Sequence, residues 1–262
     1  MDLGLRNKRA HVLGAGSGLG KAVALALACE GATVVAAGRT PEKLEATCAE
    51  IKAAGGKAYA LACDLRNIDA IPAVAEAAKK LLGGNIEILF NNGGGPAPTP
   101  AQGQPMQAWH NQFDNLVASV IAMTDAVLPE MKAAGWGRII TNASSGVVVP
   151  IANLAMSNAL RSALVGWSKT LANEVAAQGI TVNMVLPGRI NTDRLQFLDE
   201  ARAKRENITA QEVTEKMKAA IPAKRYGNPN EYGDVVAFLA STRASYITGS
   251  MIRVDGGAIA SV

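Results

Sequence analysis

Short runs of β-branched and apolar residues alternate with alanine-rich helical stretches along the whole chain, and this alternation limits the fold more than any other feature. Parallel strands need a long crossover between them, which is usually a helix. The pattern therefore predicts an α/β fold in which one doubly wound parallel sheet carries helices on both faces. The seven expected strands are Arg9–Leu13, Thr33–Ala37, Lys57–Ala62, Ile86–Phe90, Gly137–Asn142, Thr181–Leu186 and Ser250–Val254.

Between these strands, several segments have the apolar spacing of helices. No linker, repeat or low-complexity tract separates them, so we expect residues 1–262 to form a single domain. A charged helical insertion at about residues 192–222 and a glycine- and proline-rich loop after Asn92 each follow an expected strand. Ligands of open α/β sheets bind outside the carboxyl ends of the strands, so both segments are candidates to cover a substrate. The expected helices are Leu19–Glu30, Pro41–Ala53, Ile68–Leu82, Met106–Ala134, Ala155–Gln178 and Asn230–Ala240.

Charge and hydropathy exclude several classes of protein. With 49% hydrophobic and 18% charged residues, the chain has enough apolar side chains for a packed core, which argues against disorder. The net charge is +4, but basic and acidic residues are interleaved, so we expect no nucleic-acid partner. No apolar run is long enough to span a membrane, and the start of the chain passes from Asp2 into the first strand without a signal peptide. These features predict a cytoplasmic protein without a membrane partner.

Cysteine and histidine are too few and too scattered for a disulfide framework or a metal centre. The three cysteines, Cys29, Cys48 and Cys63, have no CxxC spacing, and the chain has only two histidines, His11 and His110. We therefore expect reduced core thiols, no metal site and no histidine-based catalytic triad.

A glycine-rich turn, GAGSGLG, follows the first expected strand and precedes the first expected helix. In this context the spacing of Gly14, Gly18 and Gly20 is typical of a dinucleotide-binding Rossmann domain, where the backbone approaches a pyrophosphate. The second strand is followed by Gly38, at the position where NAD(H)-binding domains carry a carboxylate that holds the adenosine ribose. Arg39 follows, and its planar cation suits a 2′-phosphate, so we expect NADP(H) to be preferred over NAD(H).

Together with further motifs, this turn resembles the short-chain dehydrogenase/reductase superfamily, over essentially the whole chain. The motifs are CDL, which contains Asp64, then NGG after the fourth strand, GRIITNASS, VLPGRINT, and the tail from AKRYGNPNEYGDVVAFLAS to RVDGG. The resemblance implies a Rossmann fold, hydride transfer and a dinucleotide site. The cofactor ligands that the turn and the resemblance imply are Gly14, Gly16, Ser17, Gly18, Leu19, Gly20, Arg39, Asp64, Leu65, Asn92, Gly93, Arg161, Pro187, Gly188, Ile190 and Thr192.

The chain departs from the family at the catalytic positions. Members use a Ser to orient the carbonyl, a Tyr as the acid, a Lys that lowers the pKa of that Tyr, and a helix Asn that holds a water. Ser144 matches the Ser, whereas Ser157 and Arg161 stand at the Tyr and Lys positions, and Leu116 stands at the Asn position with Asn115 one residue away. A serine hydroxyl is a far poorer acid than a tyrosine, and an arginine stays protonated. The resemblance thus implies Ser144, Ser157 and Arg161 as the catalytic set, with Arg161 reading mainly as a cofactor ligand.

A tyrosine near the insertion is the remaining alternative for the acid, and Tyr226 is the one that could reach the site. Tyr226 and Tyr232 are the tyrosines nearest the insertion, and the family's residue at the position of Tyr226 is ordinarily structural.

Two functions remain open at this point. The first is a short-chain oxidoreductase that moves hydride between NADP(H) and a small carbonyl or alcohol substrate, with a C-terminal half like that of 3-oxoacyl carrier-protein reductases. The second is a catalytically silent NADP(H)-binding protein with a regulatory or structural role. The resemblance also implies a homotetramer, because the helices 106–134 and 155–178 pair across a two-fold axis in the family.

Overall fold

One parallel sheet forms the centre of the protein, of which the computed structural model describes residues 2–261. Its seven strands lie in the order β3-β2-β1-β4-β5-β6-β7, so the chain changes direction across the sheet between β1 and β4. Neighbouring strands pair in parallel along the whole sheet. The strands are β1 (Arg9–Leu13), β2 (Thr33–Gly38), β3 (Lys57–Ala62), β4 (Ile88–Asn91), β5 (Gly137–Asn142), β6 (Ile180–Pro187) and β7 (Met251–Val254).

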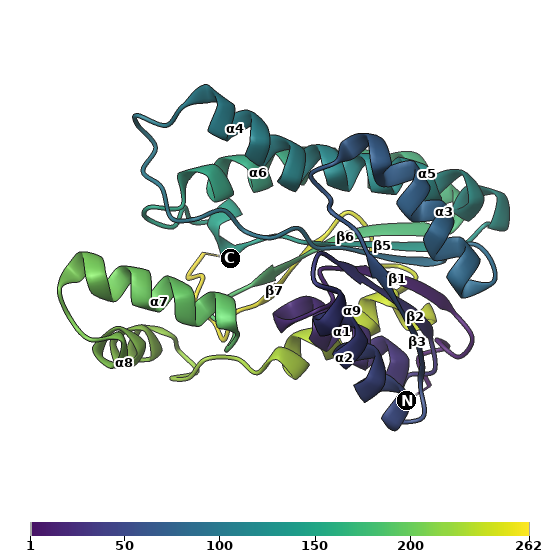
Figure 1. Cartoon of the computed structure of the whole chain (residues 1–262), viewed down its shortest axis with the longest axis horizontal. Coiled ribbons are helices and arrows are strands. Elements are labelled where there is room, and N and C mark those ends of the chain that lie inside the picture. Colours follow the sequence, from purple (N-terminus) through teal and green to yellow (C-terminus); the bar gives the residue numbers. More distant parts are fainter. Residues whose placement is uncertain (1, 262) are drawn as a thin grey trace.

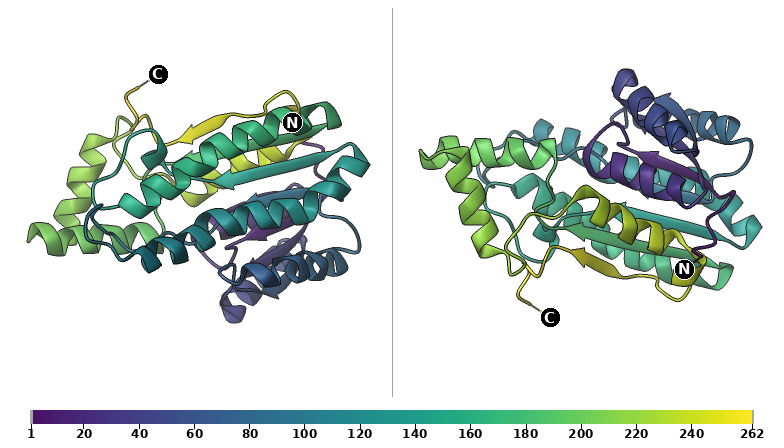
Figure 2. Two further views of the ribbon diagram at one scale, coloured as in Figure 1. Left: turned by 90° about the horizontal axis from the view of Figure 1, so that it is seen from above. Right: turned by 90° about the horizontal axis from the view of Figure 1, so that it is seen from below.

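Helices cover both faces of this sheet. Helices α1, α2 and α9 lie on one face, and α3, α5 and α6 lie on the other (Figures 1 and 2). The doubly wound fold expected from the alternating pattern is therefore confirmed. The helices are α1 (Gly18–Cys29), α2 (Pro41–Ala53), α3 (Ile71–Leu82), α4 (Met106–Phe113), α5 (Ser119–Ala134), α6 (Ala155–Val175), α7 (Asp193–Glu206), α8 (Ala210–Ala220) and α9 (Pro229–Ala240).

The segment 106–134 differs from the single helix that the periodicity predicts. Helices α4 and α5 are joined by a π-helical turn at Asp114–Ala118, which places one more residue in that turn than an α-helix would. The hydroxyl of Ser119 donates to the carbonyl of Asn115, 2.8 Å away, inside this turn.

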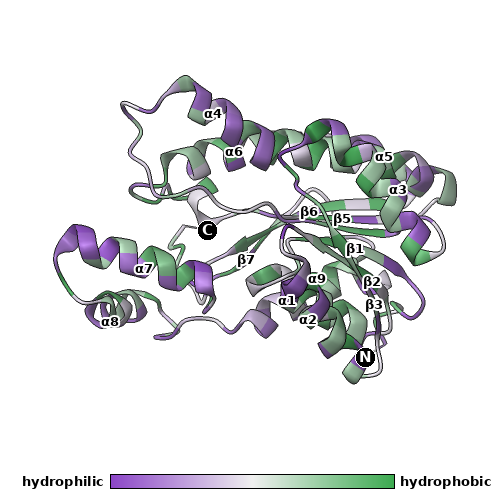
Figure 3. Cartoon of the chain, in the orientation of Figure 1, coloured by the Kyte–Doolittle hydropathy of each residue, from purple (hydrophilic) through white to green (hydrophobic). Residues whose placement is uncertain are grey.

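The charged insertion folds as two helices, α7 and α8, which project beyond the carboxyl ends of the strands (Figure 1). Thr192 caps α7, since its hydroxyl accepts from the backbone N–H of Leu195 at 3.3 Å. Thr209 and Glu212 form a reciprocal capping box at the start of α8. Much of α7 and α8 is hydrophilic, whereas the central strands are largely hydrophobic (Figure 3). The insertion therefore consists of two helices with capped N-termini, and we call it the lid after its substrate-covering role, which stays a prediction.

Apolar side chains fill both spaces between the sheet and its helices. One cluster lies beneath α1, α2 and α9, and the second lies beneath α3, α5 and α6. Tyr232 of α9 is completely buried, with its ring edge-on to Phe90 of β4 at a centroid distance of 6.4 Å. No helix within residues 2–261 is both long and apolar enough to cross a bilayer.

His11 lies fully buried in β1, and neither of its ring nitrogens has a hydrogen-bond partner. Burial disfavours the charged imidazolium and lowers the pKa of His11 to about 4. The unfolded chain, with an ordinary histidine pKa near 6.5, therefore binds the proton more tightly than the folded chain does. The stabilising effect of a neutral His11 is complete above pH 6.5 and is lost as the pH falls towards 4.

We therefore expect the free energy of unfolding, measured by urea denaturation, to fall between pH 7 and pH 4 by roughly 3 kcal/mol more in the wild type than in a His11→Leu variant. His110 is exposed, so a His110→Gln variant should follow the wild type. Equal pH dependence in the wild type and His11→Leu would show that His11 does not control acid stability.

Candidate functional site

The chain adds strands towards one edge of the sheet up to β3 and towards the other edge from β4 onwards, so the order reverses between β1 and β4. Open α/β folds bind ligands at the carboxyl ends of the strands at such a point. The glycine-rich turn follows β1 at this point. Gly14 has a positive φ of 65°, and a Cβ on it would lie 2.6 Å from the side-chain nitrogen of Asn92, the residue after β4. A Cβ on Gly20 would lie 2.1 Å from the carbonyl oxygen of Gly14. Neither position accepts a side chain without displacement of the backbone, so β1, α1 and the end of β4 meet closely.

The start of α1 is open to a ligand. Ser17 occupies the N-cap position, yet its side chain makes no capping hydrogen bond, which leaves the first N–H groups of the helix available. Gly18 has a φ of 54°, and a Cβ on it would come within 3.5 Å of the Thr192 methyl carbon. The structure thus brings the glycine turn and the first residues of the lid together, around a cavity of 280 Å³.

A chain of buried hydrogen bonds connects the strand ends behind this turn. The hydroxyl of Tyr232 donates to Oδ1 of Asn142 at 2.8 Å, and Nδ2 of Asn142 donates to Oδ1 of Asn92 at 2.8 Å. Arg161 of α6 donates from Nη1 to the carbonyl of Asn142 at 2.8 Å and from Nη2 to the carbonyl of Gly93 at 3.4 Å. The predicted ligands Asn92, Gly93 and Arg161 therefore lie side by side.

The charge of Arg161 is costly in this position. Its side chain is 6% exposed, and burial lowers the pKa of its guanidinium to about 10, with repulsion from Arg194 acting in the same direction. The group stays protonated at neutral pH. Its two described hydrogen bonds go to neutral carbonyls and use only part of its five N–H donors, so it can still bind another acceptor.

The two predicted catalytic serines come from β5 and α6. Ser144 caps a short 3₁₀ turn, because its hydroxyl oxygen accepts from the N–H of Gly146 at 3.0 Å. This leaves the hydroxyl proton of Ser144 free for donation. Ser157 lies in the first turn of α6 and is 7% exposed. A Cβ on Gly146 would touch both the Ser144 hydroxyl and the side chain of Asn158, so the end of β5 packs directly on the start of α6.

Asn115 and Leu116 both lie beside Gly93, where a Cβ on the glycine would be 3.6 Å from a methyl carbon of Leu116. Nδ2 of Asn115 donates to the carbonyl of Gly94 at 3.1 Å, and a Cβ on Gly93 would lie 2.9 Å from the Asn115 carbonyl. Leu116 is buried in an apolar cluster with Ala143 and Leu164. The sequence count that puts Leu116 at the family's asparagine position, with Asn115 one residue away, therefore stays a prediction.

At the far end of the cleft, Arg39 follows β2 and is exposed. Asp64 is held by Arg66, whose Nε lies 3.0 Å from the carboxylate and whose Nη2 lies 2.5 Å from it. Hydrogen bonding to Arg66, with a weaker attraction from Arg39, lowers the pKa of Asp64 to about 2. Arg39 and Asp64 thus lie near each other, and Arg66 is a neighbour that the sequence reading missed.

The remaining predicted ligands occupy positions around the same strand ends. Gly188 follows β6, and a Cβ on it would lie 2.6 Å from the Cα of Asp255. Ile190 is buried and pairs with Gly227. Leu65 packs against the apolar cluster beneath α3, and Leu19 against the cluster beneath α1. The further predicted ligands Gly16 and Pro187 lie in the glycine turn and at the end of β6.

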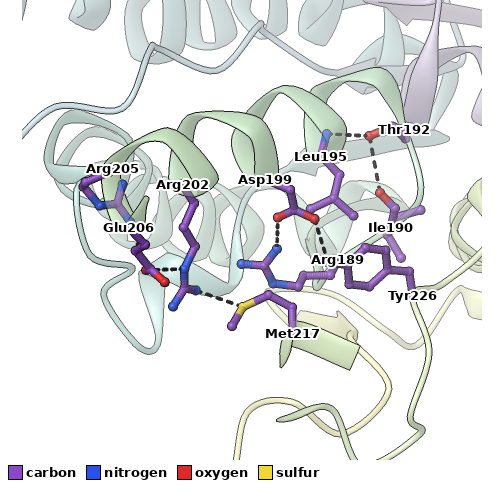
Figure 4. A network of polar contacts seen from close by, with 10 residues as sticks. All are labelled: Arg189, Ile190, Thr192, Leu195, Asp199, Arg202, Arg205, Glu206, Met217 and Tyr226. Carbon is purple, nitrogen blue, oxygen red and sulfur yellow. Dashed lines mark hydrogen bonds and ion pairs between the residues drawn. The ribbon is translucent and has the colours of Figure 1, made fainter. Parts of the chain in front are cut away.

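The tyrosines near the lid are occupied elsewhere. The hydroxyl of Tyr226 donates to Asp199 at 2.6 Å, and Arg189 donates to the other oxygen of that carboxylate at 2.6 Å (Figure 4). Burial and the Asp199 carboxylate raise the pKa of Tyr226 to about 12. Tyr226 therefore anchors α7 and is a poor proton donor at neutral pH.

The larger described cavity does not mark the site. It measures 660 Å³ and lies between α7, α8 and the turn 225–229, where none of the sequence-predicted ligands is found. In the described part of the chain, no group of three or more His, Cys, Asp or Glu side chains is placed to hold a metal ion.

Comparison with known proteins identifies the family. The family model described as enoyl-(acyl carrier protein) reductase matches residues 14–258. The chain belongs to the short-chain dehydrogenase/reductase superfamily and is an oxidoreductase of that type.

Relatives and solved structures agree over nearly the full length. The chain is 36% identical to dehydrogenase/reductase SDR family member 4 of Oryctolagus cuniculus, covering 97% of this chain and 94% of that protein. It is 34% identical to the 3-oxoacyl-[acyl-carrier-protein] reductase of Aquifex aeolicus, covering 98% and 99%. L-sorbose reductase from Gluconobacter frateurii, solved with NADPH and L-sorbose, superposes with a TM-score of 0.93 at 30% identity and full coverage of both chains.

The contact between Gly20 and Gly14 generates a test of the glycine turn. A Gly20→Ala variant should bind NADPH at least about tenfold more weakly, because the new methyl group displaces the Gly14 carbonyl and the turn with it. Fluorescence titration measures the affinity. Gly166→Ala, in α6 with open space around its Cβ, is the matched control and should bind normally. Normal affinity in Gly20→Ala would contradict this placement of the cofactor.

Proposed function

We propose that this protein transfers a hydride between NADP(H) and a carbon atom of a small carbonyl or alcohol substrate, using a non-standard active site. The observation that carries the proposal is the side-chain-free turn at Gly14 and Gly20, which lies beside an uncapped α1 N-terminus at the sheet's switch point. This arrangement fits a dinucleotide diphosphate, because backbone N–H groups and the helix dipole both favour an anion there. The bound nicotinamide supplies the hydride chemistry.

In this proposal Ser144 orients and polarises the substrate carbonyl. Its hydroxyl oxygen already accepts from the N–H of Gly146, so its proton points to the remaining acceptor, the substrate oxygen. Arg161 binds the nicotinamide ribose with its remaining N–H groups, and its buried positive charge stabilises negative charge that develops on the substrate oxygen.

Ser157 lines the place where the family has its tyrosine. Its hydroxyl is too weakly acidic to supply a proton at neutral pH by itself. Ser157 therefore acts as a hydrogen-bonding group, and the alkoxide that hydride transfer leaves on a reduced carbonyl takes its proton from solvent water. Asn115 positions the loop after β4 through its bond to the carbonyl of Gly94.

NADP(H) is the proposed cofactor because Arg39 is the exposed cation after β2 and Gly38 leaves no carboxylate beside it. The location in the cytoplasm remains a prediction. We also propose the homotetramer. In support, exposed apolar side chains such as Tyr246 and Met251 lie on or near β7, which has no strand on its outer side in the single chain.

An assay of NADPH oxidation with a panel of aldehydes and ketones, and of NADP⁺ reduction with alcohols, tests the function. Cofactor-dependent turnover of at least one substrate is the expected result. NADPH binding without turnover across the panel would instead support the catalytically silent protein.

The proposed role of Arg39 predicts the cofactor preference. An Arg39→Ala variant should bind NADPH about 10- to 100-fold more weakly and NADH nearly unchanged, because it loses a charge-assisted contact to the 2′-phosphate. Calorimetric titration with both cofactors measures this. If Arg66→Ala abolishes the preference and Arg39→Ala does not, the phosphate contact belongs to Arg66.

The departures at Ser157 and Arg161 predict a gain of activity. The double variant Ser157→Tyr with Arg161→Lys should reduce simple ketones faster than the wild type, because it restores an acid and the cation that lowers its pKa. Adding Ser144→Ala should then lower kcat by about 100-fold or more, as expected for loss of a donor to the developing oxyanion. If the wild type already matches the double variant on ordinary ketones, the reading of a degenerate acid is wrong.

A further inference from the structure

A second arginine, which is partly buried, reaches this region from the lid. Arg194 lies in the first turn of α7. Its Nη2 donates to the carbonyl of Pro96 at 2.5 Å, and Pro96 belongs to the loop after β4. A Cβ on Gly95 would lie within 3.4 Å of three atoms of this guanidinium. The Phe197 ring, 5.5 Å from the guanidinium carbon, supports the side chain from the lid. Arg194 therefore lies at the edge of the cleft where the lid meets the loop that begins at Asn92.

The two arginines at this end of the cleft have no acidic partner. Within residues 2–261, neither Arg161 nor Arg194 takes part in an ion pair. Burial lowers the pKa of each guanidinium, and they are near enough that Arg194 further lowers the pKa of Arg161. The buried carboxylate on α7, Asp199, is already paired with Arg189 and bonded to Tyr226.

The groups described around the two guanidinium ions are otherwise neutral. They are the carbonyls of Gly93, Pro96 and Asn142, together with the amide of Asn115 on the same loop. One buried and one partly buried cation among neutral dipoles form an unfavourable arrangement, and a bound anion would relieve both the desolvation and the repulsion. An uncompensated pair of this kind, in a ligand cleft, indicates a negatively charged ligand.

The cofactor diphosphate does not account for this charge. The diphosphate is expected at the N-terminus of α1, where Thr192 lies close to Gly18. Arg194 instead contacts Gly95 and Pro96, which follow the end of β4. Thr192, the N-cap of α7, thus contacts the glycine turn, whereas Arg194, in the first turn of α7, contacts the loop after β4. The charge of Arg194 therefore lies where the lid meets the loop after β4.

From this arrangement we propose that the substrate is an oxo acid or hydroxy acid, whose carboxylate binds Arg194. The planar guanidinium can donate two parallel hydrogen bonds to a carboxylate. When the substrate binds, these bonds replace the bond from Arg194 to the Pro96 carbonyl. This inference rests on the proposed hydride transfer and deepens it, because it selects free acids over neutral ketones, esters and acyl thioesters.

The test compares each acid with its neutral counterpart. NADPH-loaded protein is assayed, by turnover and by calorimetric binding, with 2-oxo and 3-oxo acids of four to ten carbons and with their methyl esters. We expect kcat/KM or affinity for at least one acid to exceed that for its ester by tenfold or more. If every ester binds and reacts as well as its acid, or no acid binds, the proposal is overturned.

Two charge-removing variants on α7 locate the effect. Arg194→Gln should lower kcat/KM or affinity for the acid by about 10- to 100-fold and so remove the preference for the acid. The same quantity for the ester, and the affinity for NADPH, should stay within about twofold of the wild type. Arg205→Gln removes the same charge from the exposed end of the helix and should change neither.

The outcomes separate this inference from the proposed function. If Arg194→Gln weakens NADPH and leaves acid discrimination intact, the arginine serves the cofactor and the inference fails. Turnover of esters and ketones without a preference for acids also overturns the inference but leaves hydride transfer standing. Failure of NADPH to bind, or of any substrate to react, rejects the proposed function itself.

Discussion

The buried hydrogen bonds of Asn142 hold the site together. Its side chain joins Tyr232 to Asn92, and its carbonyl accepts from Arg161, so one residue at the end of β5 connects α9, the end of β4 and α6. Each bond lies in a water-poor interior, where an unmade partner would be expensive. The glycine turn depends on the same network, because it packs against Asn92. A Cβ on Gly14 would lie 2.6 Å from the Asn92 side-chain nitrogen, and a Cβ on Gly20 would lie 3.0 Å from it.

An arginine instead of a lysine at position 161 changes what this network can do. The Arg161 guanidinium spans from Asn142 to Gly93 with two nitrogens, whereas a lysine offers a single nitrogen. In the proposed reaction Arg161 therefore supplies a permanent charge and passes no proton. Ser157, four residues earlier in the same helix, stands where the family has the tyrosine whose pKa a lysine would lower. We accordingly propose that this site acts by polarisation and charge stabilisation rather than by an acidic side chain.

Much of the fold could be predicted from the sequence, because apolar runs and strong helix boundaries leave little choice. Pro41 starts α2 and β5 is an unbroken buried run, and both elements begin and end where the pattern placed them. The π-helical turn could not be predicted, since apolar periodicity tolerates one inserted residue, and the sequence therefore predicts one continuous helix over residues 106–134. Arg194 was missed for a different reason. Arg194 lies in a charged insertion, where the sequence indicates a solvent-exposed side chain. Its contact with the loop after β4 exists only in the folded structure.

The first turn of α7 links the two halves of the proposed reaction. Thr192 caps the helix and lies against Gly18 of the glycine turn, while Arg194, two residues on, bonds the loop after β4. Asp199, fixed by Arg189 and Tyr226, anchors the same helix two turns further along. Thr192 and Arg194 therefore share one fixed turn of helix, and the proposed carboxylate contact has the same support as the contact to the glycine turn. An arginine on a sheet strand would lack this direct connection to the start of α7.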